Sequence, residues 1–176
     1  MKHEYKKHEK DLYQPKNKPS LIDVTMMKYI ALKGEGNPNS QAFAHKIEAL
    51  YACAYTIKMF PRNGVQIPNY FDYTVYPLEG VWDLSLKGRL EETLNKDELV
   101  YTIMIRQPEF VSDEIVKLAL EKSMHKNDEI KDIEFHTIME KMRGKINADI
   151  EMIKQGLKEN EYLDYYPAPA EFISPY

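Results

Sequence analysis

Residues 99–107, LVYTIMIRQ, constrain the fold most, because they read as a strand that is apolar at both odd and even positions. One face of this strand carries a row of large apolar residues, Tyr101, Ile103 and Ile105. The other face is also largely apolar, through Val100, Thr102 and Met104. A strand with two apolar faces is normally covered on both sides. We therefore expect helices over one face, and a second cover or a bound ligand beside Met104 over the other.

The remaining segments mix helical and strand patterns without a strict βαβ alternation. Further strands are predicted over residues 20–24, 28–34, 70–82, 130–138 and 171–173. Helices are predicted after Ser40 and Ser112, whose hydroxyls can cap a helix, and over 140–157. The polar stretch 83–98 is predicted as a loop or irregular hairpin. This mixture is typical of an α+β domain with an antiparallel or mixed sheet and helices on one face.

The order of these elements suggests an internal repeat. With the two short strands before Gly34 merged, the first half reads β-α-β-β. The second half reads strand, helix, strand, as an abbreviated copy of the first. Two such units usually meet around a pseudo-twofold axis, and the concave joint between them is a natural ligand site.

Charge is unevenly distributed along the 176 residues, whose formal net charge is −4. Residues 1–19 hold six Lys against three acidic residues, and the rest of the chain holds 18 basic and 25 acidic residues. An acidic body lacks the basic face of a nucleic-acid-binding protein, so no nucleic-acid partner is expected. We expect residues 1–19 to form a solvated basic arm and residues 20–176 to form one domain.

Several other classes of protein are not expected. The sequence has no run of about 18 apolar residues and no apolar core of a secretory signal in its first twenty residues, which predicts a cytoplasmic protein without a membrane partner. The five histidines are scattered and form no cluster with the single cysteine, so neither a metal nor a cofactor is expected. Cys53 lies among apolar residues and is predicted to be a buried small hydrophobe.

Aromatic residues give the strongest compositional signal for a function. Ten of them lie in two segments, YFDYTVYPLEGVW at 70–82 and YLDYYPAPAEFISPY at 162–176. Each segment places a carboxylate beside apolar residues, Glu79 in the first and Glu171 in the second. Burying a carboxylate is costly unless a cationic ligand, a donor side chain or a proton compensates it. Either these segments line a pocket for a flat or cationic hydrophobic molecule, or the aromatic residues fill a core and both glutamates face water.

Three segments together resemble the GyrI-like small-molecule-binding family: LYQPKNKPSLIDV at 12–24, DYTVYPLEGVW at 72–82 and YTIMIRQPEFVSDE at 101–114. They resemble most its stand-alone cytosolic branch, whose members carry PLEGLW-type and MIRQPDFVT-type segments. The resemblance covers about residues 10–125. It implies a GyrI-like or SOUL-type fold of two β-α-β-β-type units around a pseudo-twofold axis, with the second unit abbreviated in this chain.

The resemblance also implies a function. Related domains sense drugs in multidrug regulators, where an acidic residue in an aromatic pocket meets cationic hydrophobic ligands. Some stand-alone relatives hydrolyse strained cyclopropane-bearing DNA alkylators, so this chain is a possible detoxifying hydrolase by resemblance alone. Carried over by position, the resemblance makes Glu171 the central pocket carboxylate and catalytic candidate, with Glu79 as a second acid. Tyr73, Tyr76 and Trp82 would be the pocket walls.

A different class of function stays open. A protein-interaction or inhibitor module would use the same concave face or an exposed sheet edge. The abbreviated second unit would leave such an edge, which favours a homodimer. A ligand pocket predicts that flat aromatic cations quench the fluorescence of a buried Trp82, whereas an interaction module predicts no ligand response.

Overall fold

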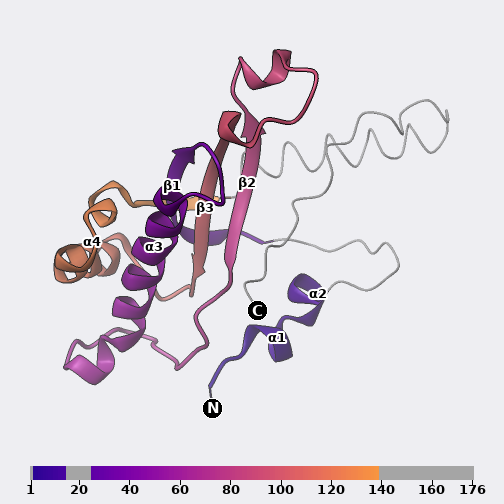
Figure 1. Ribbon diagram of the computed structural model, residues 1–176. Coiled ribbons are helices and arrows are strands. Elements are labelled where there is room, and N and C mark those ends of the chain that lie inside the picture. The colour runs from indigo at the N-terminus through magenta and orange to yellow at the C-terminus, as the bar shows by residue number, and fades with distance from the viewer. Residues whose placement is uncertain (1, 15–24, 139–176) are drawn as a thin grey trace.

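The computed structural model describes residues 2–14 and 25–138 (Figure 1). Four strands form one sheet in the order β2-β3-β1-β4, with every neighbouring pair antiparallel. Their bounds are β1 Met27–Glu35, β2 Leu78–Leu84, β3 Leu99–Gln107 and β4 Glu134–Ile138. The predicted α+β class with an antiparallel sheet is therefore confirmed, and the strand at 99–107 is a central strand of the sheet.

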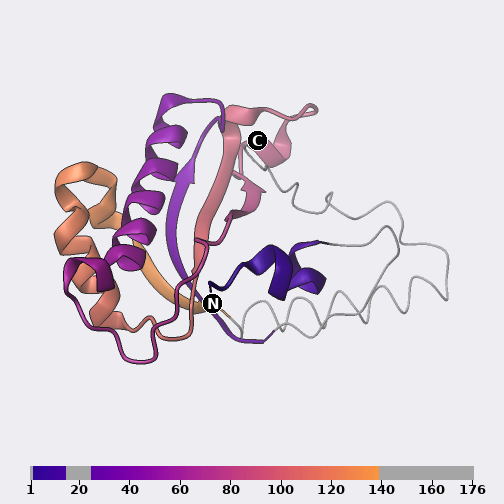
Figure 2. The same cartoon turned by 90° about the horizontal axis from the view of Figure 1, so that it is seen from below.

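Two helices, α3 (Gln41–Met59) and α4 (Asp113–Ser123), lie on one side of this sheet. Two short helices, α1 (Tyr5–His8) and α2 (Lys10–Tyr13), lie on the opposite side (Figure 2). Short 3₁₀ helices complete the described chain: η1 Pro61–Asn63, η2 Gly88–Leu90, η3 Lys96–Glu98, η4 Met124–Lys126 and η5 Asp128–Asp132. Within the described residues, no helix has both the length and the apolar character that a membrane crossing requires.

Both predicted helix caps are confirmed. The hydroxyl of Ser40 accepts a hydrogen bond from the amide of Phe43 at 3.2 Å, and that of Ser112 accepts one from Ile115 at 3.4 Å. These bonds satisfy amides that have no partner within the first turn of a helix. The caps thus fix where α3 and α4 begin relative to the strands before them.

The main core lies between the helices and the sheet side that faces them, which we call the helix face; Ile30, Ile103 and Ile105 belong to it. Leu50, Cys53 and Ile57 of α3 are fully buried in the same cluster. Cys53 is thus the buried small hydrophobe that the sequence predicts, and burial raises the pKa of its thiol to about 12.

The predicted strand at 70–82 is wrong for its first eight residues, because the ladder with β3 begins only at Leu78. Pro77, directly before it, has no amide hydrogen to extend the ladder. Tyr73 forms an isolated parallel bridge with His3 instead. The predicted strand at 20–24, the helix at 140–157 and the segment at 171–173 lie outside the described residues.

Candidate functional site

The second side of the sheet, which we call the arm face, carries side chains that pair across the three strands β1, β2 and β3. The register places Tyr29 opposite Arg106, and Met104 opposite both Ala31 and Glu79. Paired residues of adjacent strands point to the same face of a sheet. The arm face therefore combines an acid, a base and a tyrosine with the apolar surface of Met104 and Ala31.

Residues 2–14, which we call the N-terminal arm, cover part of the arm face (Figure 2). His3 donates its amide hydrogen to the carbonyl of Asp72 at 2.7 Å and accepts one from Thr74 at 2.8 Å. Leu12 packs against the buried cluster of Met27, Tyr29, Ala31 and Met104. The prediction of a solvated arm is therefore wrong for these residues. Its lysines are exposed, but its few apolar and aromatic side chains contact the sheet and the segment before β2.

Glu79 of β2 is the carboxylate of this face. It is half-buried, and its Oε2 accepts a hydrogen bond from the hydroxyl of Tyr29 at 3.2 Å. Its Oε1 accepts one from the hydroxyl of Tyr13, an arm residue, at the longer distance of 3.5 Å. Burial raises the pKa of Glu79, and the two hydroxyls and nearby Arg106 oppose this rise only in part. Glu79 is thus placed to bind a proton or a cation.

Arg106 of β3 holds the second carboxylate of the site, Glu9 of the arm. Its Nη1 donates hydrogen bonds to Glu9 Oε2 and, at 3.3 Å, to the hydroxyl of Tyr13. Glu9 Oε1 also accepts a hydrogen bond from Tyr76 at 2.7 Å and lies 2.8 Å from Nε2 of His3. Burial alone would raise the pKa of Glu9, but these donors lower it below its ordinary value. The pKa of Glu79 is therefore raised and that of Glu9 is lowered. Opposite shifts of two neighbouring carboxyl groups are a pattern that separates acid and base roles.

Tyrosine rings lie around the ion pair of Glu9 and Arg106. Tyr76 is almost fully buried and stacks on Tyr5 with ring centroids 5.6 Å apart, and Tyr13 lies 5.8 Å from Tyr76. Tyr73 is buried in the main core beside Phe71 and Phe110, with its ring centroid 6.5 Å from that of Tyr76. The structure therefore brings Tyr76, Glu79 and Met104 to one face, with Tyr73 behind them.

Trp82 does not belong to this face, so its prediction as a wall beside Glu79 is wrong. It packs on the helix face against Phe43 and Tyr101, with ring centroids 5.6 and 5.0 Å away. Residues three apart in a strand point to opposite faces, which separates Glu79 from Trp82. A Cβ atom on Gly80 would lie 2.8 Å from Nε1 of Trp82, so this glycine makes room for the indole. Residues 77–82 (PLEGVW) thus supply side chains to both faces of the sheet.

Glu171, the predicted catalytic residue, lies outside the described residues. Sequence reasoning missed Glu9, Tyr13 and Tyr29. For Arg106, at the end of the strand 99–107, the sequence allows anion binding and favours a strand cap or pairing with Glu109. Of the three missed residues, only Tyr29 carries a usable sequence signal. In the predicted strand 28–34, its side chain falls on the same face as that of Ala31. Arm residues gave no signal, because their partners are 60 or more positions away in sequence.

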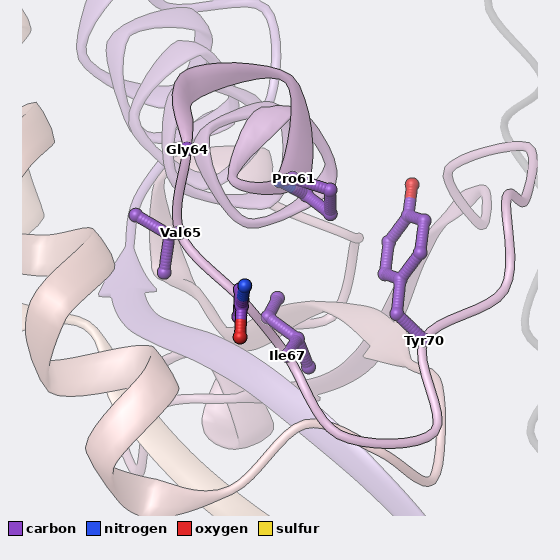
Figure 3. Close-up of a pocket in the computed structure, with 6 residues that line it drawn as sticks. Pro61, Gly64, Val65, Ile67 and Tyr70 are labelled. Atoms are coloured by element: carbon purple, nitrogen blue, oxygen red, sulfur yellow. The ribbon is translucent and has the colours of Figure 1, made fainter.

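An open pocket of about 460 Å³ lies elsewhere, after the end of α3 (Figure 3). Its lining residues are Pro61, Gly64, Val65, Gln66, Ile67 and Tyr70. It contains no carboxylate and no basic group, so it offers little for polar chemistry. Within residues 2–14 and 25–138, no three His, Cys, Asp or Glu side chains converge as a metal site would need. We therefore place the candidate site at the Glu79 cluster, formed by Glu9, Tyr13, Tyr29, Tyr76, Glu79 and Arg106.

No family model and no curated protein matches the chain. Three solved structures from Listeria innocua are similar to it. A hydrolase encoded by lin2189 is 32% identical with a TM-score of 0.67, over 78% of this chain and 67% of that one. A structure described as a hydrolase is 31% identical with a TM-score of 0.66, over 77% of this chain and 65% of that one. An uncharacterized conserved protein is 32% identical with a TM-score of 0.67, over 77% of this chain and 66% of that one. The chain thus spans about two thirds of the length of these proteins. At this identity and coverage, the chain belongs to the same protein family as the Listeria innocua hydrolase encoded by lin2189.

Proposed function

We propose that the chain binds hydrophobic, aromatic or cationic small molecules in the cytosol, at the Glu79 cluster. The observation that carries this proposal is the half-buried carboxylate of Glu79, whose pKa is raised by burial on a sheet face that no long helix of the described chain covers. A cationic ligand would relieve the cost of ionising Glu79 there. The rings of Tyr13, Tyr29 and Tyr76 would add flat apolar surface and cation–π attraction.

The two-unit architecture implied by the GyrI-like resemblance is part of the same proposal. The described order β1-α3-β2-β3 supplies one β-α-β-β unit, and α4-β4 follows it. We propose that β4 begins the abbreviated second unit. The arm face would then be the concave joint that holds the ligand, and Glu171 remains the predicted second pocket acid.

Hydrolysis of the bound molecule is the second candidate function. Two of the similar Listeria innocua proteins are described as hydrolases, and a partly buried carboxyl group with a raised pKa is a candidate for general acid–base catalysis. For a strained cyclopropane-bearing alkylator, the oxygen of water would bond to a ring carbon while a ring C–C bond breaks. The released electron pair would pass to the conjugated acceptor of the substrate. Glu79 would take the proton from water and deliver it to that acceptor, with Tyr29 orienting the carboxylate.

Binding is tested with acridine orange, a flat cationic dye, by its fluorescence anisotropy. Trp82 lies on the other face, so a signal from the dye is preferable to quenching of the tryptophan. Wild type should bind saturably, Glu79→Gln about tenfold more weakly because a charge-assisted contact is lost, and Glu109→Gln, an exposed control, like wild type. Equal affinity of Glu79→Gln and wild type would remove Glu79 from the site, and no saturable binding would favour the protein-interaction module.

Hydrolysis is tested separately in ¹⁸O-labelled water with a cyclopropane-bearing alkylator. The wild-type product should carry one ¹⁸O atom, and Glu79→Gln should lose at least about 100-fold in rate, the usual scale of an acid–base group. Turnover that survives in Glu79→Gln would assign the chemistry to another group.

A further inference from the structure

The carboxylate of Glu9 is bound mainly by groups that the arm does not supply. Arg106 of β3 donates to Oε2, and the hydroxyl of Tyr76, before β2, donates to Oε1 at 2.7 Å. His3 is the one arm residue that contacts this carboxylate, at 2.8 Å. The side chains of Arg106 and Glu9 are 13% and 16% exposed, so the pair is largely shielded from water. Two of the three partners of the carboxylate would therefore stay in place if the arm moved away.

The two groups that bind this carboxylate from outside the arm are a central-strand residue and a buried tyrosine that precedes β2. The guanidinium of Arg106 lies over the ring of Tyr76, with its Cζ atom 4.6 Å from the ring centroid. Arg106 comes from a central strand, and Tyr76 is 3% exposed. Nε of Arg106 is buried without a hydrogen-bond partner among the described residues, so Glu9 does not satisfy all donors of the guanidinium. Arginine and tyrosine in this arrangement recognise a planar carboxylate.

The arm itself is held by few backbone contacts. Helices α1 and α2 have four residues each, a length at which a helix contributes little stability of its own. One bridge, between His3 and Tyr73, joins the arm to the segment before β2. The other contacts are made by side chains: the Glu9 pair, the two hydrogen bonds of the Tyr13 hydroxyl, and the packing of His3, Tyr5, Leu12 and Tyr13. A ligand that replaces these side-chain contacts can therefore compete with the arm.

We propose that Arg106 and Tyr76 form a carboxylate-binding subsite, which the chain's own Glu9 occupies until the carboxylate of a ligand displaces it. This inference rests on the proposed function, because the subsite adjoins Glu79. The hydroxyl of Tyr13 accepts from Arg106 at 3.3 Å and donates to Glu79 at 3.5 Å, so one hydroxyl separates the two groups. The ligand class that fits both is an aromatic molecule with a carboxylate at one end and a cationic body that reaches Glu79.

Two dyes that differ in one group test the subsite. Rhodamine B carries a free carboxylate on a cationic aromatic body, and its ethyl ester has the same body with the carboxylate masked. Glu9→Gln should bind rhodamine B about tenfold more tightly than wild type does, because the internal competitor has lost its charge, while its affinity for the ester changes little. Glu4→Gln, a change on the same arm away from Arg106, should bind both dyes like wild type.

Arg106→Gln should lose the preference for the free carboxylate, and Arg106→Lys, which keeps the charge without the planar fork, should retain part of it. Thermal melts would show that each variant is folded. Equal affinity of Glu9→Gln for the two dyes, or a preference that persists in Arg106→Gln, would overturn the subsite.

Binding of benzoate distinguishes a failure of the carboxylate subsite from a failure of the proposed function. Binding of benzoate to Glu9→Gln that depends on Arg106 would support the subsite even if acridine orange failed to bind at Glu79. Glu79-dependent binding of acridine orange without any carboxylate preference between the rhodamines would overturn the subsite alone.

Discussion

Tyr13 accepts a hydrogen bond from Arg106 and donates one to Glu79, so a single hydroxyl links the basic and the acidic group of the site. Arg106 is at the same time engaged by Glu9, which leaves Glu79 without a direct ion pair among the described residues. The arm therefore does more than cover the sheet. It neutralises the arginine and keeps the acid of β2 in an environment that raises its pKa.

Glu79→Gln should gain stability relative to wild type as the pH rises. The folded chain binds the Glu79 proton more tightly than the unfolded chain, so wild type loses stability as the pH rises from the ordinary value of 4.5 through the higher folded pKa. The amide does not ionise, so the variant lacks this loss. Urea unfolding at pH 4 and pH 7 measures the difference, and a gap between variant and wild type that is the same at both values would contradict the raised pKa.

Glu9→Gln should show the opposite dependence. Its folded pKa is lowered, so its stabilising contribution is present above the unfolded pKa and is lost as the pH falls through the folded value. We expect the variant to be less stable than wild type by roughly 1.5–3 kcal/mol at pH 7, the range of hydrogen bonds to a charged group, and by less at pH 3. Urea unfolding at the two pH values decides this, with the exposed Glu109→Gln as the control. A loss of stability that is undiminished at pH 3 would argue against an ionised Glu9.

Gly80→Ala should destabilise the sheet by roughly 1–3 kcal/mol, because the added methyl group meets the indole of Trp82. In a Trp82→Phe background the same change should cost less, since the smaller ring leaves room. Unfolding of the four proteins, followed by circular dichroism, gives the coupling between the two positions. Additive effects would mean that Trp82 does not lie over Gly80.

Cys53 should be inert in the folded chain. It is fully buried with a thiol pKa of about 12, and the thiolate is the reactive form. A disulfide reagent such as dithiobis(nitrobenzoate) should therefore modify it at pH 8 only after urea unfolds the chain. Rapid modification without urea would place Cys53 near the surface.

Amide hydrogen exchange should report the docking of the arm. The amide of His3 donates to the carbonyl of Asp72, and the amide of Thr74 donates to the carbonyl of His3, so both amides should be protected in wild type. Glu9→Gln should speed exchange at both positions, whereas Glu109→Gln should not. Unprotected amides in wild type would show that the arm is not docked in solution.

The position of the strand at 99–107 in the middle of the sheet was predictable because both of its faces are apolar and must be covered. The caps at Ser40 and Ser112 were predictable because a serine directly before a helical pattern is a local signal. The opposite orientations of Glu79 and Trp82 follow from the two-residue period of a strand, and the predicted strand at 70–82 already implies them. Grouping both residues in one pocket therefore conflicted with the strand prediction itself.

The docking of the arm had no such local signal. Glu9 and Arg106 are 97 positions apart, and nothing in either segment encodes their pairing. The lysines of residues 1–19 dominate its charge count and conceal three side chains, Tyr5, Leu12 and Tyr13, that pack against the folded chain. The net charge of the arm thus reflects its exposed lysines and gives no information on the side chains that pack against the sheet.

The central claim, that small molecules bind on the arm face, is tested most directly by methyl NMR during a titration with acridine orange. The methyl group of Met104 lies on the arm face and that of Ile103 on the helix face, so the two probes report opposite sides of one strand. We predict saturable shifts at Met104 and Met27, assigned by substitution to leucine, with little change at Ile103. Shifts confined to the helix face, or no saturable shift at Met104, would contradict the account.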